Sequence, residues 1–141
     1  MDTLIQNSKK IEVYRVRAGT AESGPFKNLV VLRQGPDLNA RQQAILKHLL
    51  LDSKTFASGR GEGGFDSGIV FRFSYGAEIA DVAVCLISGE IDFNHHTKSK
   101  PTAASLEAGA ATLTGEAFGE LVRLARKIFP GDAELESFHP S

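Results

Sequence analysis

The residue types best suited to chemistry gather between residues 81 and 96, in the stretch DVAVCLISGEIDFNHH. This stretch holds the single cysteine of the chain, two adjacent histidines and three carboxylates, namely Cys85, His95, His96, Asp81, Glu90 and Asp92. Imidazole, thiolate and carboxylate groups bind zinc, and they also act as nucleophiles or as general acids and bases. The stretch therefore raises three hypotheses: a metal site, a catalytic thiol or a charged binding surface.

Alternating apolar residues on both sides of Ser88-Gly89 predict a β-hairpin with these two residues as its loop. The predicted register places Asp81 opposite His96 and Cys85 opposite Asp92. One face of the hairpin then carries Val82, Val84, Leu86, Ile91, Phe93 and His95. The other face carries Asp81, Ala83, Cys85, Ile87, Glu90, Asp92, Asn94 and His96. A slip of one residue would mix the two sets, so the register is well specified.

The two histidines are a weak basis for a metal site. Neighbouring strand residues point to opposite faces, so His95 and His96 are not expected to bind one ion together. A zinc site needs three or four ligands within ~2.0–2.3 Å of one point. Asp81, Asp92 and His96 share a face, but they would converge only at a bulge. We therefore expect no metal and no cofactor, and keep as the alternative function a small metal-dependent enzyme or regulator that uses these three residues.

A catalytic thiol would need a base within hydrogen-bond reach and a lowered pKa. His48 and His96 are the candidate bases for Cys85. The predicted register places Cys85 opposite Asp92, however, and a neighbouring carboxylate raises the pKa of a thiol. We therefore expect Cys85 to be a packed side chain, and we expect no catalytic residues and no enzymatic activity.

The segment GRGEGG at residues 59–64 matches the glycine spacing of a dinucleotide-binding loop. Such a loop must follow a strand and open a helix, so that the phosphates meet the helix N-terminus. Here the glycines follow a predicted helix and lead into a predicted strand. We expect instead a loop that contacts a partner, with Arg60 and Glu62 as its charged residues.

Hydrophobic periodicity predicts about five strands, which cover residues 11–17, 28–33, 69–75, 81–87 and 90–96. Amphipathic helices are predicted over residues 39–51 and 114–129, with Asp37 or Asn39 capping the first and Thr114 capping the second. The order β-β-α-β-β-β-α predicts an α+β fold of two layers, in which both helices cover one face of a mainly antiparallel sheet.

The rest of the chain is expected to complete a single α+β domain over residues 1–141. Residues 98–113 are predicted to form a connector, and residues 1–10 and 133–141 to be flexible termini. The acidic tail either packs on the domain or forms a docking segment; its relevant residues are Asp132, Glu134, Leu135, Glu136 and Phe138.

Composition argues against several function classes. The 141 residues are 42% hydrophobic and carry a formal net charge of −1, so a basic surface for nucleic acid or for an anionic membrane is not expected. A single cysteine excludes an internal disulfide. No apolar run approaches the ~20 residues of a membrane span, and the N-terminal segment lacks the apolar run of a secretory signal. We expect a cytoplasmic location.

Arg72 connects the hairpin to the preceding strand. If residues 69–75 lie beside the hairpin, Arg72 shares a face with Glu90, Asp92, Asn94 and His96. Cross-strand ion pairs on that face would contribute ~0.2–1 kcal/mol each. The alternative is a recognition surface with charges of both signs, which gives a binding protein specificity and fast association. These five residues are the predicted partner-binding residues.

Several segments together resemble a set of small bacterial α+β proteins, many of them uncharacterised. The similarity covers roughly residues 26–132, and it consists of the helix over 39–51, the strand ending in FRF, the strand DVAVCLISG and the helix ending in IFPGD. Members of the set tend to carry a C-F-x-C run where this chain has CLIS at residues 85–88. The second cysteine is thus absent here, and no thiol-based role is carried over.

Some proteins of that set resemble immunity proteins, which neutralise interbacterial toxins. The resemblance therefore implies a non-enzymatic protein that binds and occludes a partner, most simply a toxin encoded beside it. Self-association is a further expectation, because residues 11–17 could offer an edge strand for pairing with a second copy.

Overall fold

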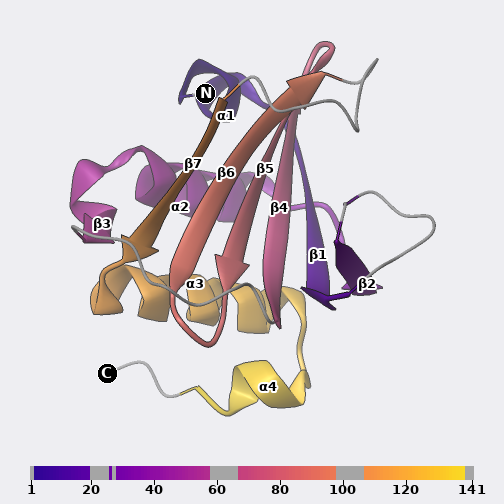
Figure 1. Ribbon diagram of the computed structural model, residues 1–141, viewed down its shortest axis with the longest axis vertical. Coiled ribbons are helices and arrows are strands. Elements are labelled where there is room, and N and C mark those ends of the chain that lie inside the picture. The colour runs from indigo at the N-terminus through magenta and orange to yellow at the C-terminus, as the bar shows by residue number, and fades with distance from the viewer. Residues whose placement is uncertain (1, 20–25, 27, 58–66, 98–106, 139–141) are drawn as a thin grey trace.

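The computed structural model describes residues 2–19, 26, 28–57, 67–97 and 107–138 (Figure 1). Within these residues an antiparallel sheet runs in the order β2 Leu29–Gln34, β1 Lys10–Ala18, β4 Ser67–Tyr75, β5 Glu78–Cys85, β6 Glu90–Thr97, β7 Glu107–Leu113 and β3 Phe56–Ala57. The helices are α1 Asp2–Asn7, α2 Ala40–Leu51, the short 3-10 turn η1 Ser53–Thr55, α3 Gly115–Ile128 and α4 Ala133–Glu136. The α+β class with an antiparallel sheet is confirmed, although the described chain has seven strands and four α-helices rather than five and two.

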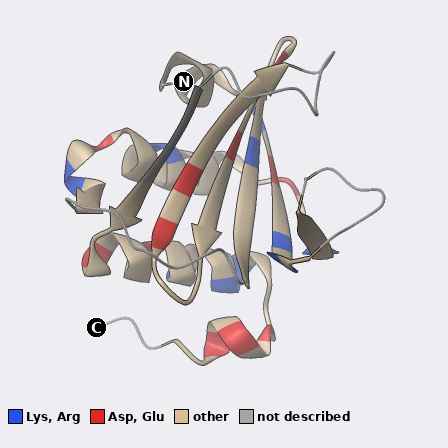
Figure 2. Cartoon of the chain, in the orientation of Figure 1, with Lys and Arg blue, Asp and Glu red and all other residues tan. Residues whose placement is uncertain are grey.

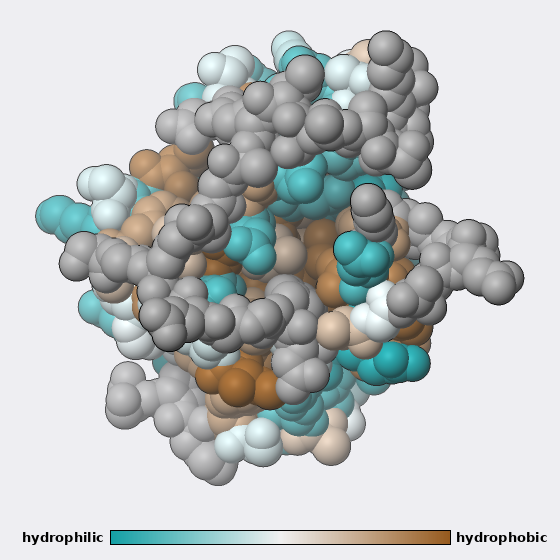
Figure 3. Space-filling model, in the orientation of Figure 1, coloured by the Kyte–Doolittle hydropathy of each residue, from teal (hydrophilic) through white to brown (hydrophobic). Residues whose placement is uncertain are grey.

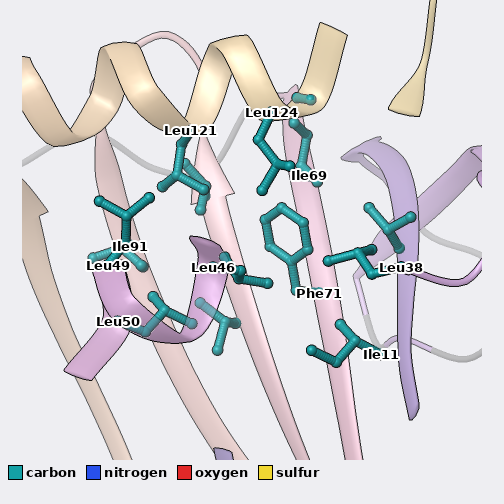
Figure 4. Packing of buried hydrophobic residues seen from close by; sticks show 14 of the residues in the cluster. Ile11, Leu38, Leu46, Leu49, Leu50, Ile69, Phe71, Ile91, Leu121 and Leu124 are labelled. Atoms are coloured by element: carbon teal, nitrogen blue, oxygen red, sulfur yellow. The ribbon is translucent and has the colours of Figure 1, made fainter. Parts of the chain in front are cut away.

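The main core lies between the helices and one face of the sheet (Figures 1 and 4). Phe71 and Phe73 of the interior strand β4 are fully buried, and they belong to one cluster with Leu46 of α2 and Leu121 of α3. Burying a side chain of this size stabilises the fold by roughly 1.5–3 kcal/mol. These apolar contacts hold β4, β5 and β6 in place, and the strands in turn position the side chains on their opposite face.

Both long helices begin where the sequence predicted. Asn39 accepts a hydrogen bond from the backbone N–H of Gln42 (2.9 Å), and the Gln42 side chain accepts one from the backbone N–H of Asn39 (3.0 Å). This reciprocal pair is a capping box, and it selects Asn39 over Asp37 as the cap. Thr114 caps α3 by accepting from the N–H of Ala117.

The segments expected to be flexible termini contain helices that pack on the core. Helix α1 buries Leu4 and Ile5, and α4 buries Leu135, all three within the main cluster. Helices of six and four residues have little stability of their own. They are held by these apolar contacts, and α4 also by its cap, Asp132, whose side chain accepts from the N–H of Leu135. The acidic tail therefore packs on the domain.

Two strands of the sheet differ from their expected places. The predicted connector over residues 98–113 contains β7, which pairs with β6 on one side and with β3 on the other. The strand expected at an edge, β1, lies between β2 and β4. The edges of the described sheet are instead β2 and β3, so pairing of β1 with a second copy is not available in this fold.

The predicted hairpin forms, but its register is shifted by two residues. Val84 lies opposite Ile91 and Asp81 opposite Asn94, so the loop covers residues 86–89 rather than Ser88-Gly89 alone. The loop closes with a hydrogen bond from the N–H of Gly89 to the carbonyl of Cys85 (3.0 Å), and Gly89 has a φ of 73°, where glycine is favoured. A slip of two residues keeps every side chain on its face, so the predicted faces of the strands remain valid.

The second face of the sheet, which points away from α2 and α3, is only partly open. A small apolar cluster covers it at β1 and β4, where Phe26 packs on Tyr14, Val16 and Val70. The rings of Phe26 and Tyr14 meet edge to face, with 5.0 Å between their centroids. Seen from this side (Figure 3), hydrophilic and hydrophobic side chains lie next to one another. The polar residues of β4, β5 and β6 lie beside this cluster.

Candidate functional site

A row of polar residues crosses four strands on the second face. Cross-strand pairing places Glu12 of β1, Arg72 of β4, Asp81 of β5 and Asn94 of β6 in one line. His96 lies two residues beyond Asn94 on the same face of β6. We call these five residues the charged row. In Figure 2 its basic position on β4 lies beside the acidic position on β5, with the acidic positions of β6 next to them.

Asp81 is the centre of the charged row. Arg72 donates to both of its carboxylate oxygens, from Nε at 2.7 Å and from Nη2 at 2.9 Å, and His96 Nε2 lies 2.9 Å from Oδ2. The side chains of Arg72, Asp81 and His96 are only 13%, 12% and 7% exposed, respectively. A buried, two-pronged contact of this kind fixes both the position and the orientation of the guanidinium group.

Arg72 stays charged in this environment. Burial by itself lowers the pKa of its guanidinium group, but the hydrogen bonds and the charge of Asp81 outweigh it and hold the pKa above its ordinary value. The guanidinium group also lies over the ring of Phe26, with its carbon 4.7 Å from the ring centroid. This stacking adds a cation–π contact and gives Arg72 a second fixed neighbour.

Tyr14 lies next to the charged row and donates to Glu12 Oε2 at 2.7 Å. Burial, followed by the hydrogen bond and the charge of Glu12, raises the pKa of Tyr14 to about 12. Its hydroxyl therefore remains protonated at neutral pH and acts as a hydrogen-bond donor. It holds Glu12 in place and does not supply a base.

Two of the predicted partner-binding residues, Arg72 and His96, both contact Asp81. Asn94 and Asp92 are exposed on the same face of β6, whereas Glu90 is half-buried and His96 is buried. The other two predicted residues, Arg60 and Glu62, lie outside the described residues. Adjacent His95 points to the core face, where its Nε2 atom lies 3.4 Å from Glu78 Oε1.

The thiol chemistry that the sequence analysis considered and set aside for Cys85 also does not fit the observed register. Cys85 is 3% exposed and lies opposite Gly68, and Asp92 lies opposite Ala83 rather than Cys85. His96 pairs with Ile79, six strand positions from Cys85, and this spacing corresponds to about 20 Å along the strand. The expected pairing of Cys85 opposite Asp92 is therefore wrong, and His96 is too far from the thiol to act as its base.

Two buried polar atoms of this face have no hydrogen-bond partner in the described part of the chain. They are Nδ1 of His96 and Oε1 of Glu90. The carboxylate of Asp81 lies within hydrogen-bond distance of Nε2 of the His96 ring and so orients the opposite nitrogen, as carboxylates that accept from metal-binding histidines orient those rings. Yet the described residues contain no group of three or more histidine, cysteine or carboxylate side chains that could hold a metal ion.

The sequence did not point to Glu12, Tyr14 or Phe26 as members of this site. Glu12 and Tyr14 alternate with buried Ile11 and Val13, and this period of two was the signal that could have placed them on the second face. Phe26 comes from the segment between β1 and β2, and no periodicity marks a single aromatic residue there as a cover for a sheet.

Comparison with known protein families, curated protein sequences and solved structures gives no match for this chain. No helix within the described ranges is long and apolar enough to cross a membrane.

Proposed function

We propose that this protein is a non-enzymatic binding module, an immunity-type inhibitor that occludes a bacterial toxin encoded beside it. The observation that carries the proposal is the second face of β6. There Asp92 and Asn94 are exposed directly beside the fixed Arg72–Asp81–His96 group. Charges held in one arrangement lose little conformational freedom on binding, so more of the interaction energy is available for affinity.

The same hairpin offers an exposed apolar side chain in its loop. Ile87, in the loop between β5 and β6, is 66% exposed, the highest value among the large hydrophobic residues of the described chain. An interface of this kind combines apolar contacts with polar groups that fix the orientation of the partner. Because the exposed charge on β6 is acidic, the partner surface is expected to be basic. The proposed location is the cytoplasm, and binding requires no cofactor.

Charge reversal on β6 tests this proposal. The variant Asp92→Lys is expected to weaken binding to the co-encoded toxin by about tenfold or more, mainly through a slower association rate. Binding is measured by calorimetry and by surface plasmon resonance with the purified toxin. The matched control is Asp37→Lys, which reverses an exposed carboxylate in the segment before α2. Equal affinities for the two variants would refute recognition through β6, provided that both melt at the temperature of the unchanged protein.

The alternative function, a small metal-dependent enzyme or regulator, is favoured by one observation. Nδ1 of His96 is buried without a partner in the described residues, while Asp81 holds Nε2 of the same ring. For this function we expect purified protein to retain about one zinc ion per chain, and His96→Ala to lose it. Elemental analysis makes the measurement, and protein that binds no zinc when the metal is added in excess excludes this alternative.

A further inference from the structure

A second surface with a strong charge bias lies on the helical side of the molecule. An open groove of about 730 Å³ runs between the first half of α2 and the second half of α3. Its lining includes Arg41, Ile45, Glu120, Arg123, Leu124 and Lys127. Because α2 and α3 cover the face of the sheet opposite to the charged row, this groove is separate from the surface proposed above.

Three cations of the groove, Arg41, Arg123 and Lys127, are exposed. Their side chains make no hydrogen bond or ion pair with any described residue. Arg126, which also lines the groove, is used internally, since its Nε donates to the carbonyl of Leu135 at 2.8 Å. Glu120 is the single acidic residue of the lining. In a chain with a net charge of −1, such a local excess of positive charge is a specific feature of this surface.

The helix ends strengthen the positive potential. The groove lies at the N-terminus of α2, where the helix dipole is positive, and the first turn of α2 contains no acidic residue. The acidic residues of α3, Glu116 and Glu120, lie in its first half, whereas Arg126 and Lys127 lie in its last turn. Figure 2 shows this separation of charge along α3. The positive end of one helix and the basic end of the other therefore meet at the groove.

The floor of the groove is apolar. Leu124 is 4% exposed beneath it, and Ile45 is 38% exposed at its side. A ligand that satisfies both the cations and this apolar strip must combine negative charge with at least one aliphatic side chain. An acidic amphipathic helix has this combination, and helices commonly bind in grooves between two other helices. Nucleic acid fits less well, because its backbone requires a longer basic surface and offers nothing aliphatic to Ile45.

We propose that the groove between α2 and α3 binds an acidic amphipathic segment of a partner protein. Carboxylates of this segment contact Arg41, Arg123 and Lys127, and one of its aliphatic side chains packs on Ile45 and Leu124. The attraction between exposed charges is screened by salt, so the affinity falls as ionic strength rises. This inference goes beyond the binding function proposed for β6 and does not depend on it.

Fluorescence anisotropy with a defined probe tests the groove. The probe is a labelled, end-capped amphipathic peptide of leucine and glutamate, about 15 residues long. The variant Arg123→Glu with Lys127→Glu is expected to weaken its binding by about tenfold or more. The matched control, Arg17→Glu with Lys9→Glu, changes the same residue types and the net charge by the same amount at exposed positions of β1 and of the segment before it. The control is expected to change the affinity less than about twofold.

Three results would overturn the proposal. The first is a peptide that does not bind the unchanged protein at low salt, and the second is equal weakening by the groove variant and its control. The third is tighter binding of a single-stranded oligonucleotide than of the peptide, which would assign the groove to nucleic acid. The milder pair Arg123→Gln with Lys127→Gln, expected to weaken binding by about fivefold, is used if the charge reversals prevent folding. Asp92→Lys should leave peptide binding unchanged, so failure of the β6 proposal and failure of this one remain distinguishable.

Discussion

Replacing Asp81 by alanine is expected to lower the free energy of unfolding by about 3–5 kcal/mol. Asp81 is the shared partner of Arg72 and His96, and all three side chains are at most 13% exposed. Removing the carboxylate takes from the buried guanidinium group the acceptor of its Nε and Nη2 hydrogen bonds, and takes from the buried imidazole the hydrogen bond at Nε2. Both losses incur the desolvation penalty of groups that water cannot reach in the folded state.

Urea titration of Asp81→Ala measures this effect, and Asn94→Ala is its control. Asn94 lies directly opposite Asp81 but is exposed, so its replacement is expected to change stability by no more than about 0.5 kcal/mol. The double variant Arg72→Met with Asp81→Leu is expected to recover part of the loss, because apolar side chains of similar volume leave no unpaired charge. A loss below about 1 kcal/mol for Asp81→Ala would mean that water and the other neighbours of Arg72, Glu12 among them, compensate for the lost carboxylate.

The hairpin shows how far the sequence could predict this fold. Alternation of apolar and polar residues gave the correct faces, because a side chain's face depends only on whether its position is odd or even. The loop was predicted two residues too short, since Leu86 binds through its N–H to the carbonyl of Ser67 and buries its side chain in the core. Those contacts are made to another strand, and the local pattern of the hairpin contains no trace of them.

Strand β7 was missed for a related reason. Its sequence, EAGAATL, has few of the β-branched and aromatic residues that favour strands. It forms because β6 and β3 supply backbone hydrogen bonds on its two sides.

The candidate site was predictable to the same extent. Alternation placed Arg72 and His96 on one face, but only the observed register makes Asp81 the residue that joins them.

Arg15, on the opposite face of the sheet, is expected to be as important for stability as Asp81. It is 4% exposed, and it donates to Asp132 at 2.8 Å, to Glu134 at 2.7 Å and to the carbonyl of Gly68 at 2.8 Å. Arg15→Met should therefore lower the free energy of unfolding by about 3–5 kcal/mol at neutral pH. The contacts join β1 and β4 to α4, so the loss should also appear as faster proteolysis of the C-terminal helix.

The dependence of stability on pH in the acid range distinguishes the contribution of the Asp132 charge from that of its packing. Burial raises the pKa of Asp132, but hydrogen bonds from Arg15 and from the backbone, together with the charge of Arg15, outweigh it and hold the pKa below its ordinary value. A carboxyl with a lower pKa in the folded state stabilises the protein fully above its unfolded pKa of about 3.9. That contribution is lost as the pH falls through the pKa of the folded state.

Asp132→Asn tests this linkage directly. Asparagine can still cap α4, because its side-chain oxygen can accept the hydrogen bond from the N–H of Leu135. The variant should be less stable than the unchanged protein at pH 7, and the difference should shrink as the pH falls below about 4. Thermal unfolding across this pH range makes the measurement, with the exposed Asp37→Asn as the control. A difference that stays constant down to the lowest pH would show that Asp132 acts through packing and capping rather than through its charge.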